Sequence, residues 1–140
     1  MKAENPLARA PLFANLDARQ VDALAKGARR RSFNPGATMV YQGELGIGLY
    51  VLASGRAEVR RKDAEGREHV LASLGPGDFF GEMALLYDAP RTASVVAVEP
   101  TECLVLTRME FKAALRSSPE IAVELLEVLG KRLQGLLGAS

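Results

Sequence analysis

The stretch NPGATMVYQGELGIGLYVLASGRAEV, Asn34 to Val59, consists of short runs rich in Val, Leu and Tyr that are separated by glycines. Nine of the thirteen glycines in the chain fall between Gly36 and Gly81. This punctuation is typical of a sheet built from short strands and tight turns. The pattern predicts strands over residues 38–41, 48–53, 56–62, 69–74, 93–97 and 102–106.

The connections between these predicted strands are short and polar. The segment DAEGRE, residues 63–68, is typical of the tip of a hairpin. Parallel pairing would require crossover helices, and connections of this length cannot hold them. The strands are therefore predicted to pair antiparallel, in a roll, sandwich or barrel.

Helical patterns flank the predicted sheet on both sides. Asp17 followed by Gln20 resembles a capping box at the start of a short helix that ends near Gly27. Thr107 with Glu110 repeats this pattern at the start of a second helix, after the last predicted strand. The chain is expected to be mainly β, with helices at each end.

A last helix is predicted from Ser118 and Pro119, which suit its N-cap and first turn, to about Leu137. It carries two apolar stripes, one made of Ala122, Leu126, Leu129, Leu133 and Leu136 and the other of Ile121, Leu125 and Val128. Two stripes indicate either two packing partners, the sheet and a second copy of the chain, or one wide core-facing surface. Gly130 and Gly135 each weaken a helix by about 1 kcal/mol relative to alanine. We therefore expect the C-terminal end of this helix to be ordered by the groups that it contacts.

Length and composition are those of one globular domain. A chain of 140 residues, 48% hydrophobic and 25% charged, can bury a core of its own. We expect a single domain over 1–140, with an N-terminal helical segment at 12–30, a β-roll at 31–107 and C-terminal helices at 108–137. Neither a signal-peptide core nor an apolar run of membrane-spanning length is present. A cytoplasmic protein without direct membrane insertion is expected.

Charge and residue usage argue against several functional classes. Eighteen Lys and Arg against seventeen Asp and Glu give a net charge of +1, which offers no general attraction for nucleic acid. The run ARRRSF, residues 28–33, is interpreted as a solvated helix–strand junction. Cys103 is the single cysteine and His69 the single histidine, so neither a disulfide framework nor a metal cluster can be drawn. We therefore expect no metal and no enzymatic activity.

The stretch GEMALLYDAPRTASV, residues 81–95, contains the candidate binding residues. A glycine turn leading into one helical turn is expected to leave backbone N–H groups unpaired from Gly81 to Ala84, and such groups bind anions. Arg91 can add paired hydrogen bonds to phosphate oxygens. Glu82 would repel a phosphate, so it is expected to accept hydrogen bonds from hydroxyls of the same ligand. An anion joined to a hydroxylated ring indicates a nucleotide.

The run FGEMALLYDAPRTASV, Phe80 to Val95, resembles the phosphate-binding cassette of cyclic nucleotide-binding domains. The family pattern is Phe-Gly-Glu, a small residue, Leu, a variable stretch, and Pro-Arg followed by a small or hydroxyl residue and Ala. The glycine-marked stretch at residues 34–59 and LGPGDFFGE at residues 74–82 are also similar to the family. The resemblance includes the cytosolic domains of cyclic-nucleotide-regulated channels and the sensor half of catabolite-activator-type regulators. It implies an eight-stranded antiparallel β-roll, jelly-roll-like, with an N-terminal helix and two C-terminal helices.

The resemblance also implies a site for each part of a cyclic nucleotide. It assigns the phosphate to Arg91, Thr92 and the amides near Gly81, Glu82 and Ala84, the ribose hydroxyl to Glu82, and the base to Val59, Val70, Ala72 and Arg132. For the three apolar residues the alternative is ordinary core, and Lys131 is the rival of Arg132. The Thr92 hydroxyl is similar to that of domains that accept cyclic GMP, while Thr-bearing members also bind cyclic AMP. The expected ligand is therefore cAMP or cGMP.

The mechanism implied by the family makes the last helix a lid. Bound nucleotide would give Arg132 and Leu129 something to pack on and draw the helix inward. The chain would then be a sensor whose effector or partner is not in this sequence, either a stand-alone protein or an excised domain. The alternative is a β-roll module that associates through its last helix, as a homodimer, without dependence on nucleotide.

Overall fold

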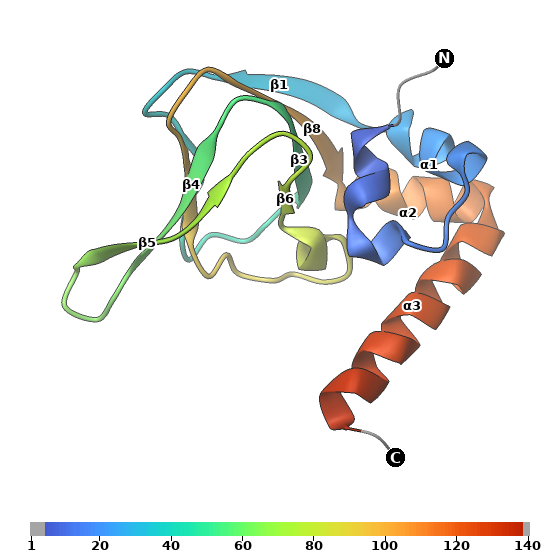
Figure 1. The fold of residues 1–140 in the computed structure, drawn as a ribbon. Helices are drawn as coiled ribbons and strands as arrows, with labels where there is room; N and C mark the ends of the chain where they lie inside the picture. Colours follow the sequence, from blue (N-terminus) through green and yellow to red (C-terminus); the bar gives the residue numbers. More distant parts are fainter. Residues whose placement is uncertain (1–4, 139–140) are drawn as a thin grey trace.

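A computed structural model describes residues 5–138 of the chain. In that range eight strands form two antiparallel four-stranded sheets, ordered β1-β8-β3-β6 and β2-β7-β4-β5 (Figure 1). The strands are β1 Arg29–Phe33, β2 Thr38–Val40, β3 Gly48–Ser54, β4 Ala57–Lys62, β5 Glu68–Leu74, β6 Phe79–Phe80, β7 Ser94–Ala97 and β8 Thr101–Thr107. The helices are α1 Ala18–Ala25, α2 Arg108–Ser117 and α3 Pro119–Leu137, with short 3-10 helices η1 Pro6–Arg9, η2 Pro11–Phe13 and η3 Glu82–Leu85. The predicted antiparallel β fold with flanking helices is confirmed.

Strand β3 is buried on both faces because it separates two apolar cores. Leu49 and Val51 belong to a core shared with the helices, whereas Tyr50 and Leu52 belong to the core inside the roll. Successive side chains of a strand point to opposite faces. The unbroken apolar run of β3 therefore follows from its place between the two cores.

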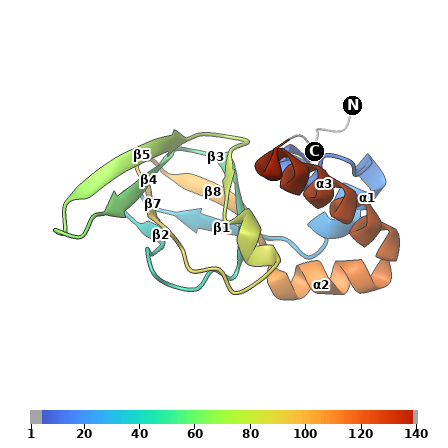
Figure 2. The same ribbon diagram turned by 90° about the horizontal axis from the view of Figure 1, so that it is seen from below.

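The helical elements gather at one end of the roll (Figures 1 and 2). Phe13 of η2 and Phe111 of α2 have ring centroids 6.4 Å apart. Leu24 of α1 and Ile121 of α3 are fully buried in the same apolar cluster. This cluster also contains Leu85 of η3, so it joins the helical end to the stretch that carries the candidate site.

The predicted starts of α1 and α2 are confirmed by their capping bonds. The Asp17 carboxylate accepts a hydrogen bond from the Gln20 N–H at 2.9 Å, and the Gln20 side chain accepts one from the Asp17 N–H at 3.1 Å. The Thr107 hydroxyl accepts one from the Glu110 N–H at 3.2 Å. These bonds satisfy N–H groups that a first helical turn leaves unpaired, and they depend only on nearby sequence.

Helix α3 buries one of its two predicted stripes. Ile121, Leu125 and Val128 are buried, and the helix packs on η2 and α2. The predicted arrangement with two packing partners placed one stripe on the sheet, and the buried stripe faces these helices instead. Leu126 and Leu133 of the other stripe are 67% and 57% exposed. Across residues 5–138, no helix is long and apolar enough to cross a membrane.

Some elements were missed by the sequence patterns. The arginine run interpreted as a junction forms β1, which pairs with β8 from Arg29 opposite Val105 to Phe33 opposite Thr101. Ladder hydrogen bonds involve the backbone alone, and charged side chains are common on edge strands such as this one. The 3-10 helices η1 and η2 were also missed.

Phe111 should be a principal support of the helical end. It is 2% exposed, and Met109 on the same helix is 79% exposed. We predict that Phe111→Ala lowers the free energy of unfolding by about 3–5 kcal/mol, the usual loss for a buried aromatic side chain. The control Met109→Ala should change it by less than about 0.5 kcal/mol. Urea unfolding of both variants measures the difference, and equal losses would contradict the packing described.

Candidate functional site

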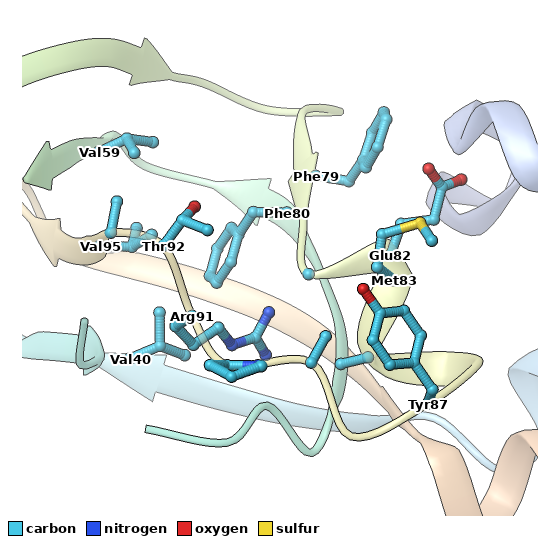
Figure 3. A pocket seen from close by; sticks show the side chains of 15 residues that line it. Val40, Val59, Phe79, Phe80, Glu82, Met83, Tyr87, Arg91, Thr92 and Val95 are labelled. Atoms are coloured by element: carbon cyan, nitrogen blue, oxygen red, sulfur yellow. The ribbon is translucent and has the colours of Figure 1, made fainter. Parts of the chain in front are cut away.

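A pocket of about 330 Å³ lies beside the segment that joins β6 to β7 (Figure 3). This volume is within the range of about 300–1,000 Å³ that is usual for small-molecule sites. Val59, Val95 and Thr92 lie at one end, and Glu82, Met83 and Tyr87 at the other. The lining includes six of the residues predicted from sequence, Val59, Gly81, Glu82, Ala84, Arg91 and Thr92.

The backbone turns at Gly81 to enter η3. Gly81 has φ of +84°, in the left-handed region that glycine adopts without strain. A Cβ at this position would also collide with the Arg91 guanidinium. The Ala84 N–H donates to the Gly81 carbonyl at 3.0 Å. The prediction of an unpaired amide at Ala84 is therefore wrong in this structure, because the single 3-10 turn closes its own hydrogen bond.

The Arg91 guanidinium is held at the pocket by a carbonyl and two aromatic rings. Its Nη2 donates to the Gly48 carbonyl at 2.9 Å. Its Cζ lies 5.8 Å and 5.9 Å from the ring centroids of Tyr50 and Phe80, which stack on each other at 4.9 Å. Both rings present faces that attract a cation.

The charge of Arg91 is partly buried and has no acidic partner within residues 5–138. The ion pairs of this range do not include Arg91. Its buried Nε lacks a hydrogen-bond partner among the same residues. Burial lowers the pKa of Arg91, and a guanidinium nevertheless remains charged at neutral pH. The arrangement favours an anion, which would supply the missing counter-charge and accept from Nε.

The segment around Arg91 is tied to the β2–β3 loop by three backbone hydrogen bonds. The Arg91 N–H donates to the Glu44 carbonyl at 2.8 Å, and the Gly43 N–H donates to the Arg91 carbonyl at 2.8 Å. The Gly46 N–H donates to the Ala89 carbonyl at 3.2 Å. The backbone at Arg91 is thus held in place by the β2–β3 loop, which lies more than forty residues earlier in the sequence.

Glu82 is buried and connects three elements. Its Oε1 accepts from the Leu12 N–H of η2 at 2.8 Å, and its Oε2 lies 3.4 Å from Nη1 of Arg132 on α3. A carboxylate offers about four acceptor sites, so both contacts leave capacity for a ligand hydroxyl. The Leu12 contact was missed because residues seventy positions apart leave no local pattern in the sequence.

The residues predicted to contact a base are only partly brought together. Val59 lines the pocket, whereas Val70 and Ala72 are exposed on β5 and lie outside the lining. Arg132 also lies outside the lining and contacts Glu82. Its rival Lys131 pairs with Glu127 on the same helix at 3.1 Å. A base contact by Val70, Ala72 or Arg132 remains a prediction.

The remaining candidates for metal or acid–base chemistry lie apart from the pocket. Within residues 5–138, no three His, Cys, Asp or Glu side chains are placed to hold a metal ion. Burial raises the pKa of the Cys103 thiol to about 12, which keeps it protonated at neutral pH. His69 pairs with Asp63 at 2.8 Å on the exposed β4–β5 hairpin.

Comparison with known proteins identifies the family. The family model of the cyclic nucleotide-binding domain matches residues 30–118. The cyclic AMP receptor protein of Thermus thermophilus is 44% identical over 124 residues, covering 89% of this chain and 57% of the relative. A CRP-like cAMP-activated global transcriptional regulator of Mycobacterium tuberculosis is 34% identical over 128 residues, covering 91% of this chain and 57% of the relative. The chain therefore spans less than two thirds of these relatives.

Solved structures agree with this result. The N-terminal domain of a transcriptional regulator from Streptomyces coelicolor has a TM-score of 0.87 at 33% identity, covering 94% of this chain and 92% of that one. The catabolite activator protein of Thermus thermophilus has a TM-score of 0.74 at 42% identity, covering 91% and 60%. The fold and site define a ligand-binding β-roll, and the chain belongs to the cyclic nucleotide-binding domain family.

Glu82 should support the ligand-free fold as well as any ligand. We predict that Glu82→Ala lowers the free energy of unfolding by about 1–3 kcal/mol, because it leaves the buried Leu12 N–H without an acceptor. Glu82→Gln keeps one carbonyl oxygen and should lose less. Thermal unfolding of both variants without nucleotide tests this, and a Glu82→Ala protein as stable as the parent would contradict it.

Proposed function

We propose that this domain binds cAMP or cGMP in the pocket beside η3 and acts as a regulatory sensor, without catalysing a reaction. The observation that carries the proposal is Arg91, a partly buried cation with an unpartnered Nε and no acidic partner among residues 5–138. A cyclic phosphate would supply the missing negative charge. Hydrogen bonds to charged groups contribute about 1.5–3 kcal/mol each.

The position of Glu82 supports one orientation of the nucleotide. Arg91 and Glu82 both line the pocket and lie at separate places along it (Figure 3). We place the cyclic phosphate by Arg91 and Thr92 with the amides of Gly81 and Glu82, and the ribose hydroxyl by the Glu82 carboxylate. The base would then extend toward Val59, with Val70, Ala72 and Arg132 as its further predicted contacts.

Some relatives are named for cyclic AMP and another for cyclic GMP. The relatives described above are named for cyclic AMP. A cGMP-dependent protein kinase of Eimeria tenella is 41% identical over 102 residues, covering 73% of this chain and 10% of the kinase. Cyclic GMP is therefore the second candidate ligand. The hydroxyl of Thr92 suits both. We favour cAMP because relatives named for it cover more of the chain.

We propose that α3 transmits binding to an effector or partner. Glu82 contacts both Leu12 of η2 and Arg132 of α3. A ribose hydroxyl that donates to Glu82 would change the strength of the Glu82–Arg132 contact. The preferred position of α3 would change with it. Two relatives of which this chain spans 57% are named as a receptor and a transcriptional regulator. The expectation of no nucleic-acid partner accordingly extends to these 140 residues alone.

Thermal unfolding with cAMP, cGMP and 5′-AMP tests the proposed ligand. A nucleotide at a hundred times its dissociation constant adds about 2.7 kcal/mol of stability, which should raise the melting temperature by several degrees. We predict a rise with a cyclic nucleotide and none with 5′-AMP.

Calorimetry should show about ten- to more than a hundredfold weaker binding of the cyclic nucleotide for Arg91→Ala, because a charge-assisted contact with the phosphate is lost.

Arg67→Ala is the matched control for Arg91→Ala, because Arg67 is exposed on the β4–β5 hairpin. This variant should bind as the parent does. Absence of a rise with either cyclic nucleotide would refute the proposed function. Equal binding by Arg91→Ala and the parent would place the phosphate elsewhere.

A homodimer through α3 is the second candidate, and a row of exposed apolar residues on that helix favours it. Val123, Leu126, Leu133 and Leu137 are 64%, 67%, 57% and 77% exposed. They recur at spacings of three, seven and four, with Gly130 in the gap, which matches the seam of a two-stranded coiled coil. A second copy would cover this apolar row.

Sedimentation velocity with and without cAMP tests the dimer. We predict that Leu126→Ser with Leu133→Ser shifts the chain toward monomer, because two apolar contacts of the seam are lost. Met109 is exposed on α2, so the control Met109→Ser should leave the mass of the sedimenting species unchanged. A dimer that forms equally well with and without nucleotide would favour the interaction module over the sensor, and a monomer under all conditions would refute the dimer.

A further inference from the structure

Gly46, in the β2–β3 loop, is a glycine that its backbone conformation does not require. Its φ is outside the left-handed region, in contrast to Gly43 and Gly81. A Cβ at this position would nevertheless lie 2.8 Å from Cζ and 2.9 Å from Nε of Arg91. Real Cβ atoms essentially never approach other atoms within 3.0 Å. The need for glycine at this position therefore comes from its neighbours, the Arg91 guanidinium and the Ala84 Cβ, which would also lie 2.8 Å from the added carbon.

The other walls around the guanidinium are fixed by the fold. The Gly48 carbonyl accepts from Nη2, and the stacked rings of Tyr50 and Phe80 lie against the cation. Backbone hydrogen bonds join the loop at Gly46 to the segment that carries Arg91. A side chain at residue 46 could therefore not be accommodated by moving the loop alone.

A displaced guanidinium would nevertheless have space to move. Arg91 borders the nucleotide pocket and also a second pocket of about 190 Å³, which Tyr41, Glu44, Leu45, Gly46 and Ile47 help to line. A clash at residue 46 can be relieved by a shift of this side chain into either space. The geometry of Arg91 should suffer more than the stability of the fold.

We propose that Gly46 is a positioning residue for Arg91, and that its missing side chain sets where the guanidinium meets the anionic part of the ligand. The inference rests on the proposed binding of a cyclic nucleotide. Charge-assisted hydrogen bonds depend on distance and on the direction of the N–H groups. A shift of the guanidinium would therefore weaken its bonds to a phosphate even though the arginine is still present.

Gly46→Ala in the full chain tests this inference, with binding of cAMP measured by calorimetry. We expect the affinity to fall by roughly tenfold or more, the effect of losing one charge-assisted hydrogen bond. Gly75→Ala is the matched control, because Gly75 also lies outside the left-handed region and its nearest atom would be Arg56 Nη1 at 3.8 Å. Its affinity should equal that of the parent.

A double-mutant cycle with Arg91→Ala separates positioning from general damage. The added carbon would also lie 2.8 Å from the Ala84 Cβ, so part of its effect could act through η3. We expect Gly46→Ala to change the affinity less than about twofold once Arg91 is alanine. The same loss in both backgrounds would overturn the inference and leave the proposed function intact.

The side-chain Nε–H resonance of Arg91 gives a readout that does not require a ligand. The signal is assigned by its absence in Arg91→Ala, and we expect Gly46→Ala to shift it while Gly75→Ala does not. An unchanged signal in Gly46→Ala would overturn the inference even if the parent bound no nucleotide. Should Gly46→Ala not fold, combining it with Ala84→Gly removes the contact with the Ala84 Cβ and retains the one with the guanidinium.

Discussion

The unpaired positive charge of Arg91 is the constraint on which the site depends. A partly buried guanidinium without an acidic partner among residues 5–138 is unfavourable, and the surroundings compensate only partly. One carbonyl and two stacked rings stabilise the cation, and its Nε lacks a partner in that range. An anion beside Arg91 would supply the missing partner.

The fold holds this charge by joining segments that lie far apart in sequence. Strand β3 contributes Tyr50 to the ring stack and the Gly48 carbonyl to the hydrogen bond, while the loop before it fixes the backbone at Arg91. Because β3 is buried between two cores, its position cannot change without disturbing both. The arginine therefore sits on a rigid support, which favours geometric selectivity.

Glu82 gives the same site its link to the helical end. It accepts from the Leu12 N–H and contacts Arg132, so one buried carboxylate lies next to the pocket, η2 and α3 together. The first half of α3 is anchored by Ile121 and Leu125, whereas residues 131–138 are exposed. The contact of Arg132 with Glu82 thus joins the exposed second half of α3 to the site.

The sequence by itself determined the antiparallel strands, the starts of α1 and α2 and the cassette residues Glu82 and Arg91, because period, capping and turn chemistry are local. It missed β1, since edge pairing uses the backbone, and it placed Val70 and Ala72 at a pocket whose lining they do not join. Only the tertiary structure decided which apolar stripe of α3 is buried and what surrounds Arg91. The Arg91 guanidinium contacts a carbonyl 43 positions earlier, and α3 packs on η2, near the other end of the chain. No local pattern encodes contacts of this kind.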